Sequence, residues 1–278
     1  MNTRTKEMVD LKYSWYVLFL MTFSFAVSFI DRQVMTLLIE PIKTDLSIND
    51  TQVSLLIGFA FSIFYISMAI PIARLVDKGN RVNIIALGVF FWSLMTGVCG
   101  LAKNYWQLFL ARVGVGVGEA TLTPAVYSLI PDYFPKEKLG TAVGFYMLGM
   151  SLGTGFALVL GGAILSYVSS IGDINFPFIG TLRPWQVTFL IVGLPGILLA
   201  ILIKLSVKEP VRRDIFDNID ATTSKVLLIP FIKKNFKTLL CITVAYSFGG
   251  MVFYGFLTWI PEHLRRSFDW DISNAGYV

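Results

Sequence analysis

Long apolar runs separated by short polar stretches make up most of the 278-residue chain. A helix needs about 20 mostly apolar residues to cross the hydrocarbon core of a bilayer, and seven runs are long enough. The first run continues through Asp31 and Arg32 without a small-residue cleavage site, so it is not a signal peptide. Asn49 precedes the second run and can cap its helix. The pattern predicts an all-α, polytopic membrane protein with seven transmembrane helices, which span Trp15–Ile39, Val53–Leu75, Ile84–Ala102, Tyr105–Ile130, Gly140–Val168, Trp185–Ile203 and Leu239–Ile260.

Composition and charge narrow the class of protein. Hydrophobic residues make up 55% of the chain and charged residues 15%, whereas soluble domains contain about 25% charged residues. The net charge is +5, and if the N-terminus is inside, most Lys and Arg residues lie in loops on the cytoplasmic side. The positive-inside rule therefore predicts a multi-pass protein of the cell membrane, here a bacterial inner membrane, with a cytoplasmic N-terminus. Because topology accounts for the basic charge, no nucleic acid is expected as a partner.

Residues that build catalytic or metal sites are scarce. His263 is the one histidine, and the two cysteines, Cys99 and Cys241, lie in separate apolar runs. A zinc, haem or iron–sulfur site, or a nucleophile–histidine pair, has too few residues to form. We therefore expect no metal, no other cofactor and no enzymatic activity.

Comparison of the chain with itself at an offset of 222 residues reveals a short internal similarity. Glu40 falls on Glu262 and Lys43 on Arg265, at the ends of the first and seventh runs. Two unrelated outer loops can also resemble each other, but parallel repeats are typical of transporters built from two similar halves. On this interpretation residues 1–205 form a six-helix half, 206–237 a cytoplasmic linker, and 238–278 the start of a second half, with an eighth span opening at 274–276.

Two segments have unusual charge patterns. The loop after the second run places Asp77 among Arg74, Lys78 and Arg81. An ordinary positive-inside loop does not require this acid, so the loop favours a gating role. In the fourth run, Arg112 is followed by three glycines at intervals of two and then by Glu119 at the position where a dinucleotide fingerprint needs glycine. Spaced glycines in a membrane helix instead allow close packing.

These two segments resemble the signatures of the major facilitator superfamily. Asp-Lys-Gly-Asn-Arg at 77–81 and Gly-Glu-Ala at 118–120 resemble its spinster branch most, although Ala73 replaces the usual first glycine of the loop and Gly79 is shifted by one. The resemblance implies two six-helix halves that rock about a central site, with seven of the twelve helices present in this chain. It also implies that Asp77 helps to hold the halves together. Spinster-like members move lysophospholipids, sphingoid phosphates or related amphipathic anions.

Four charges lie inside predicted spans and sum to zero: Asp31, Arg32, Arg112 and Glu119. Such residues are costly in a bilayer and are functional by default, although they can also simply pin helices together. The internal repeat aligns Asp31 with the uncharged Phe253, so the fold does not itself require a charge at this position, and a functional role is favoured. We expect the pairs Asp31–Arg112 and Arg32–Glu119. Arg32 and Arg112 are the candidate residues for binding an anionic substrate.

Glu119 is the first candidate for proton coupling and Asp31 the second. Burial favours the neutral carboxylic acid, and a neighbouring arginine favours the carboxylate. A change of arginine partner can therefore load or release a proton.

Together these features predict a secondary active transporter that works by alternating access and is coupled to protons. Its expected partners are a small-molecule or lipid-like substrate, protons and membrane lipid. The substrate is an amphipathic or anionic organic solute, either lysophospholipid-like or an organic acid, with drug export as a competing interpretation. A non-transporting membrane receptor or scaffold is the alternative from another class. An intramembrane enzyme is the weakest interpretation, since no catalytic set is recognisable.

Overall fold

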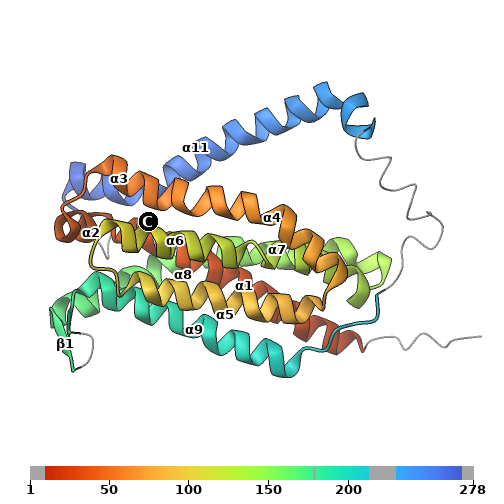
Figure 1. The fold of residues 1–278 in the computed structure, drawn as a ribbon, viewed down its shortest axis with the longest axis horizontal. Coiled ribbons are helices and arrows are strands. Elements are labelled where there is room, and N and C mark those ends of the chain that lie inside the picture. Colours follow the sequence, from red (N-terminus) through yellow and green to blue (C-terminus); the bar gives the residue numbers. More distant parts are fainter. Residues whose placement is uncertain (1–9, 178–179, 213–229, 271–278) are drawn as a thin grey trace, which may run out of the picture.

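The computed structural model describes residues 10–177, 180–212 and 230–270. Within them the secondary structure is almost entirely helical (Figure 1). The elements are α1 (Leu11–Leu37), α2 (Ile39–Leu46), α3 (Asp50–Ser54), the π-helical turn η1 (Leu55–Phe59), α4 (Ala60–Lys78), α5 (Arg81–Cys99), α6 (Tyr105–Glu119), α7 (Leu122–Tyr133), the 3-10 turn η2 (Lys136–Lys138), α8 (Leu139–Ile171), β1 (Ile174–Phe176), β2 (Gly180–Leu182), α9 (Pro184–Ser206) and α11 (Phe236–Phe268).

The seven predicted spans are confirmed, and each corresponds to a helix, or a run of helices, that is long and apolar enough to cross a membrane. The second span consists of α3, η1 and α4, and the fourth consists of α6 and α7. The fold class is therefore all-α and polytopic, as expected. A short antiparallel hairpin of β1 and β2, which pairs Ile174 with Leu182, is an addition between α8 and α9.

Local sequence explains where the second span begins. The side chain of Asn49 accepts a hydrogen bond from the backbone N–H of Gln52 at 2.9 Å, and the Gln52 side chain accepts one from the Asn49 N–H at 3.0 Å. This reciprocal capping box satisfies two of the N–H groups that a helix start leaves free. The predicted cap at Asn49 is thus confirmed.

The sequence predicts one uninterrupted helix for the fourth span, but the structure divides this span into two helices. A turn at Ala120 and Thr121 separates α6 from α7. The Thr121 hydroxyl donates a hydrogen bond to the Gly118 carbonyl at 2.8 Å. The interruption directly follows Glu119, so that residue lies at a helix end in the middle of the span.

The first six spans pack as a bundle. α1 packs along α8, and α5 packs along both α9 and α6. α11 approaches the bundle at the end that contains α2 and α3 and diverges from it toward the other end (Figure 1). We call the former the α2–α3 end. The latter, which contains the segment after α9, is the linker end.

Two parts of the predicted domain organisation lie outside the described residues. They are residues 213–229 of the linker and the predicted start of an eighth span at 274–276. The division into halves and the cytoplasmic N-terminus stay predictions.

Candidate functional site

An ion pair inside the bundle joins the first and fourth spans. Arg32 on α1 donates a hydrogen bond through Nε to Glu119 Oε2 on α6 at 2.6 Å, and its Nη2 contacts the same oxygen. The Glu119 side chain is 1% exposed and that of Arg32 18%. The expected Arg32–Glu119 pair is therefore present. The second oxygen, Oε1 of Glu119, is buried and has no hydrogen-bond partner among the described residues.

Three aromatic rings surround the Arg32 guanidinium. Its Cζ lies 4.9 Å from the ring centre of Phe29, 4.6 Å from that of Phe61 and 5.2 Å from that of Tyr65. The rings of Phe61 and Tyr65 are stacked, with centroids 5.5 Å apart. Cation–π contacts of this kind contribute about 0.5–2 kcal/mol each. They fix the position of Arg32 without using its remaining N–H groups.

Phe61 also contacts the second arginine of the site. Its ring centre lies 5.6 Å from Cζ of Arg112. The π-helical turn η1 ends two residues before Phe61. A π-turn contains an extra residue and so changes which face of the following helix turns inward, and such turns are frequent at functional sites. Phe61 and Tyr65 are among 23 phenylalanines and 11 tyrosines, and no periodic signal in the sequence distinguishes them from the aromatic residues that face lipid.

The expected Asp31–Arg112 pair is not formed. Asp31 is completely buried, and its Oδ2 accepts a hydrogen bond from the Thr96 hydroxyl on α5 at 3.2 Å. Within the described residues, Asp31 Oδ1 and the Nε and Nη1 atoms of Arg112 are buried without hydrogen-bond partners. The prediction was therefore wrong, and the hydrogen-bond partner of Asp31 is Thr96, an uncharged residue of a third helix.

Glycines of α6 explain how these charges approach neighbouring helices. A Cβ atom on Gly116 would lie 2.5 Å from the Phe61 carbonyl oxygen, and one on Gly118 would lie 2.7 Å from Cβ of Trp92. Side chains at these positions would push α6 away from α4 and α5. The predicted packing role of the glycines is thus confirmed, and it brings Arg112 next to Phe61 of the second span.

A second polar network lies at the linker end. Arg81 is 1% exposed and forms ion pairs with Asp132 at 2.5 Å and with Glu209 at 2.6 Å. It also donates a hydrogen bond to the Ser128 carbonyl at 2.8 Å. The network fixes the segment after α9 to α5 and α7.

The other predicted gating residues lie on the surface. Side chains of Arg74, Asp77 and Lys78 are exposed, with no hydrogen bond or ion pair to other described residues. Arg212 instead binds the backbone of this loop, donating hydrogen bonds to the Asp77 carbonyl and to the Gly79 carbonyl at 2.8 Å. Sequence reasoning missed Glu209, although its position as an acid among linker bases is the same signal that singled out Asp77.

The described residues contain no group of three or more His, Cys, Asp or Glu side chains that could bind a metal ion. His263 lies beyond the predicted end of the seventh span at Ile260, but it belongs to α11, because this helix continues past Pro261 to Phe268. It is exposed, and its Nδ1 lies 3.3 Å from the Ser267 hydroxyl.

Comparisons with known proteins agree with this arrangement. The family model of the Major Facilitator Superfamily matches residues 21–278. The chain is similar to the crystal structure of a bacterial homologue of the human lysosomal transporter Spinster, in an inward-facing and unoccupied conformation. The TM-score is 0.83 and the identity 35%, over 95% of this chain and 58% of that one.

Two curated relatives extend the comparison. An MFS-type efflux pump of Mycolicibacterium smegmatis is 32% identical over 65% of this chain and 39% of the pump. A sphingosine-1-phosphate transporter of Danio rerio is 25% identical over 89% of this chain and 47% of the transporter. The chain spans about half the length of these relatives. Because the family model covers most of the chain, the chain belongs to the Major Facilitator Superfamily, and it resembles the spinster branch.

Proposed function

We propose that the chain is part of a secondary active transporter that moves an amphipathic or anionic organic solute by alternating access, coupled to protons. The observation that supports this most is the buried Arg32–Glu119 pair with free bonding capacity next to it. Oε1 of Glu119 and two nitrogens of Arg112 are buried without hydrogen-bond partners among the described residues. A pair that served only to pin two helices would be expected to use these groups.

Binding of an anion follows from competition for Arg32. A guanidinium binds a phosphate or carboxylate group in bidentate fashion. A substrate anion near Arg32 therefore competes with the Glu119 carboxylate, and Arg112 offers further donors next to the same Phe61 ring. The rings of Phe29, Phe61 and Tyr65 suit an apolar substrate chain. The relative from Danio rerio is named for sphingosine 1-phosphate, a lipid with an anionic phosphate group.

Proton coupling follows from the same competition. When an anion takes Arg32, Glu119 loses its counter-ion while its side chain remains buried. A buried carboxylate without a counter-ion is more stable as the neutral acid. Glu119 therefore takes up a proton as the anion binds, so that both are loaded together and move as in symport. Asp31, whose Oδ2 accepts a hydrogen bond from the uncharged Thr96 hydroxyl, is the second candidate proton carrier.

The topology completes the proposal. Residues 1–205 form one half, 206–237 the cytoplasmic linker, and 238–278 begin the second half. The linker end faces the cytoplasm of a bacterial cell, and Arg74, Asp77, Lys78 and Arg81 belong to the gate on that side.

The test measures proton uptake by the purified full-length protein in liposomes that contain a pH-sensitive dye. Lysophosphatidic acid and gluconate serve as the lipid-like and organic-acid solutes, each with and without a pH gradient. We expect one of them to drive proton uptake in the wild type and in Glu137→Gln, a control that removes an exposed acid from η2. Uptake is lost in Glu119→Gln.

Each other outcome has a defined meaning. Solute-driven proton uptake that persists in Glu119→Gln but is lost in Asp31→Asn transfers the role to Asp31. Persistence in both variants refutes proton coupling through either residue. Binding of a solute without flux supports the receptor interpretation. Because one relative is an efflux pump, a third arm uses the lipophilic cation tetraphenylphosphonium. Transport of this cation alone would refute the anion proposal.

A further inference from the structure

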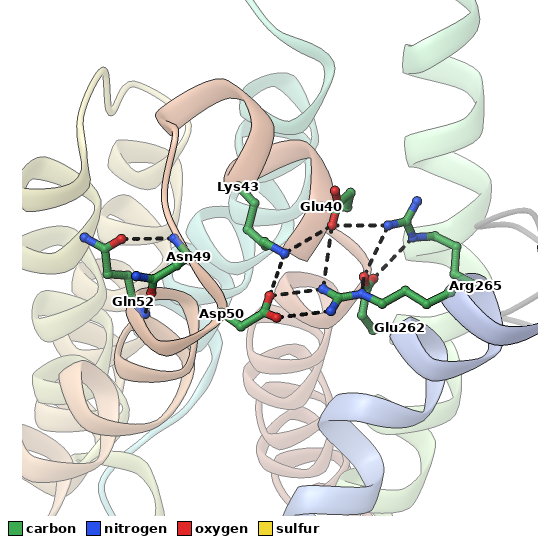
Figure 2. Close-up of polar contacts among 8 residues, drawn as sticks. Glu40, Lys43, Asn49, Asp50, Gln52, Glu262 and Arg265 are labelled. Carbon is green, nitrogen blue, oxygen red and sulfur yellow. Dashed lines mark hydrogen bonds and ion pairs between the residues drawn. The ribbon is translucent and has the colours of Figure 1, made fainter.

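Six charged residues join the end of α11 to α2 and α3, and we call them the α2–α11 ion cluster (Figure 2). Three are acids and three are bases, so the charges cancel. Its members are Glu40, Lys43, Asp50, Glu262, Arg265 and Arg266.

Two arginines of α11 bind acidic residues of α2 and α3. Arg265 Nη2 lies 3.2 Å from Glu40 Oε2. Arg266 donates hydrogen bonds to both carboxylate oxygens of Asp50, at 3.1 and 3.0 Å. A bidentate pair of this kind has a defined geometry and is stronger than a single contact. The cluster therefore fixes the position of α11 relative to α3.

Contacts within α11, and contacts between α2 and α3, hold the two sides of the cluster in place. Glu262 is 4% exposed and accepts hydrogen bonds from Arg266 Nε at 2.5 Å and from Arg265 Nη2 at 3.2 Å. On the opposite side, Lys43 Nζ lies 2.6 Å from Asp50 Oδ1. The capping box at the start of α3 fixes the backbone at Asp50. Both sides are thus arranged to meet, which reduces the entropy lost on closure.

The location of the cluster determines which end of the molecule is closed. Pro261 and Glu262, at the α2–α3 end, are the buried residues of the described α11. Toward the linker end α11 diverges from the bundle (Figure 1). Arg32 lies five residues before the end of α1 at Leu37, and α2, which contains Glu40, begins at Ile39. The cluster therefore lies at the α2–α3 end, beyond the Arg32–Glu119 pair.

We propose that the α2–α11 ion cluster is a latch that closes the α2–α3 end of the transporter and opens in each cycle. This inference rests on the proposed alternating access. Partial exposure of the pairs suits a contact that must reopen, since the side chains of Glu40, Asp50 and Arg266 are 35%, 46% and 40% exposed. Exposed ion pairs are individually weak, because water solvates the separated charges. Several together bias a two-state equilibrium without making it irreversible.

The test measures access to the site without requiring a substrate. In the full-length protein, exposed Cys241 is replaced by alanine, whereas buried Cys99 is retained. A reporter cysteine replaces Tyr65, whose ring lies 5.2 Å from the Arg32 guanidinium carbon. Proteoliposomes are treated with a membrane-impermeant maleimide from either side, and the labelling rate is compared between variants.

We expect Arg265→Gln/Arg266→Gln to raise labelling from the α2–α3 side by about fivefold or more, as expected when a coupling of this size is lost. Arg183→Gln is the matched control. Arg183 lies at the same end, but its ion pairs with Asp45 and Asp173 stay within the first six spans. If the double variant does not fold, Glu40→Gln/Asp50→Asn removes the opposite side of the latch.

Equal labelling rates in the latch variants and in Arg183→Gln would overturn the latch. Retention of the low rate in Arg265→Lys/Arg266→Lys supports a requirement for charge rather than for shape. Failure of the proposed function gives a different result. If no solute drives proton uptake in the wild type, the proposed proton coupling fails, whereas the difference in labelling rate between the variants is unaffected.

Discussion

Arg32 places two guanidinium nitrogens, Nε and Nη2, on a single oxygen of Glu119, and the other oxygen has no hydrogen-bond partner in the described part of the chain. A bidentate arginine–carboxylate pair would use both oxygens. The observed geometry thus leaves one carboxylate oxygen available for a proton when Arg32 moves to a substrate anion. It also makes the two residues strongly interdependent, which leads to the first prediction.

Removal of Arg32 leaves Glu119 as a buried charge without a counter-ion. We expect Arg32→Ala to destabilise the protein by about 3–5 kcal/mol and to lower its Tm by on the order of 10 °C. In Arg32→Ala/Glu119→Gln the charge is absent, so part of this loss should be recovered. Thermal unfolding of the detergent-purified protein measures both variants, and additive losses in the double variant would contradict the coupling.

Phe61 contacts both arginines, so its ring should contribute to substrate affinity. Phe61→Leu removes the ring face, and loss of about 0.5–2 kcal/mol corresponds to a rise in KM of about 2- to 30-fold. Phe61→Tyr retains the face and serves as the control. The measurement is KM for the solute that drives proton uptake in liposomes. An unchanged KM in Phe61→Leu would show that the ring only fills space.

The linker-end network predicts very different effects for two nearby arginines. Arg81→Gln leaves Asp132 and Glu209 without their shared arginine, and we expect a loss of about 3–5 kcal/mol. Arg74→Gln changes an exposed residue with no ion pair to other described residues, so its effect should stay within about 0.5 kcal/mol. Thermal unfolding of the two variants side by side tests the difference, and similar melting temperatures would count against the network.

Close packing of α8 against α1 predicts a contrast between two glycines. A Cβ atom on Gly153 would lie 2.4 Å from the Ala26 carbonyl oxygen, whereas one on Gly155 has no neighbour within 4 Å. Gly153→Ala should therefore destabilise the protein and displace α1, on which Arg32 lies. Gly155→Ala should be neutral or stabilising by up to about 1 kcal/mol, because alanine favours helix. The same melting experiment compares the two, and a stable Gly153→Ala would mean that α1 and α8 separate easily.

Hydrophobic patterning predicted the spans, and an asparagine directly before the second run predicted the cap at Asn49. Both features depend on residues close together in the chain. The Arg32–Glu119 pair was also predictable, since a charge inside a membrane span is costly and most often lies next to an opposite charge. Details that depend on helix rotation could not be predicted from the sequence. Each residue turns a helix by about 100°, so the extra residue of η1 changes the face that Phe61 presents, and the hydrophobicity of this segment does not reveal it.

Predictions also failed where an uncharged residue replaced an expected ion. Thr96 bonds to Asp31, and this contact depends on how α5 approaches α1 rather than on the sum of the charges. The ion pair between Arg81 and Glu209 joins residues 128 positions apart. Only the packing of α5, α7 and the segment after α9 brings these residues together.

The predicted internal repeat includes four residues of the α2–α11 ion cluster. A segment with an acid and a base three residues apart is complementary to a second copy of itself across a two-fold axis. Glu40 with Lys43, and Glu262 with Arg265, are two such copies within one chain, and the Glu40–Arg265 pair joins them. The Arg266–Asp50 pair lies outside this correspondence, because the offset aligns Arg266 with Thr44 and Asp50 with Ile272. A duplicated segment would thus provide one of the closing contacts, and two charges that the other copy lacks provide the bidentate one.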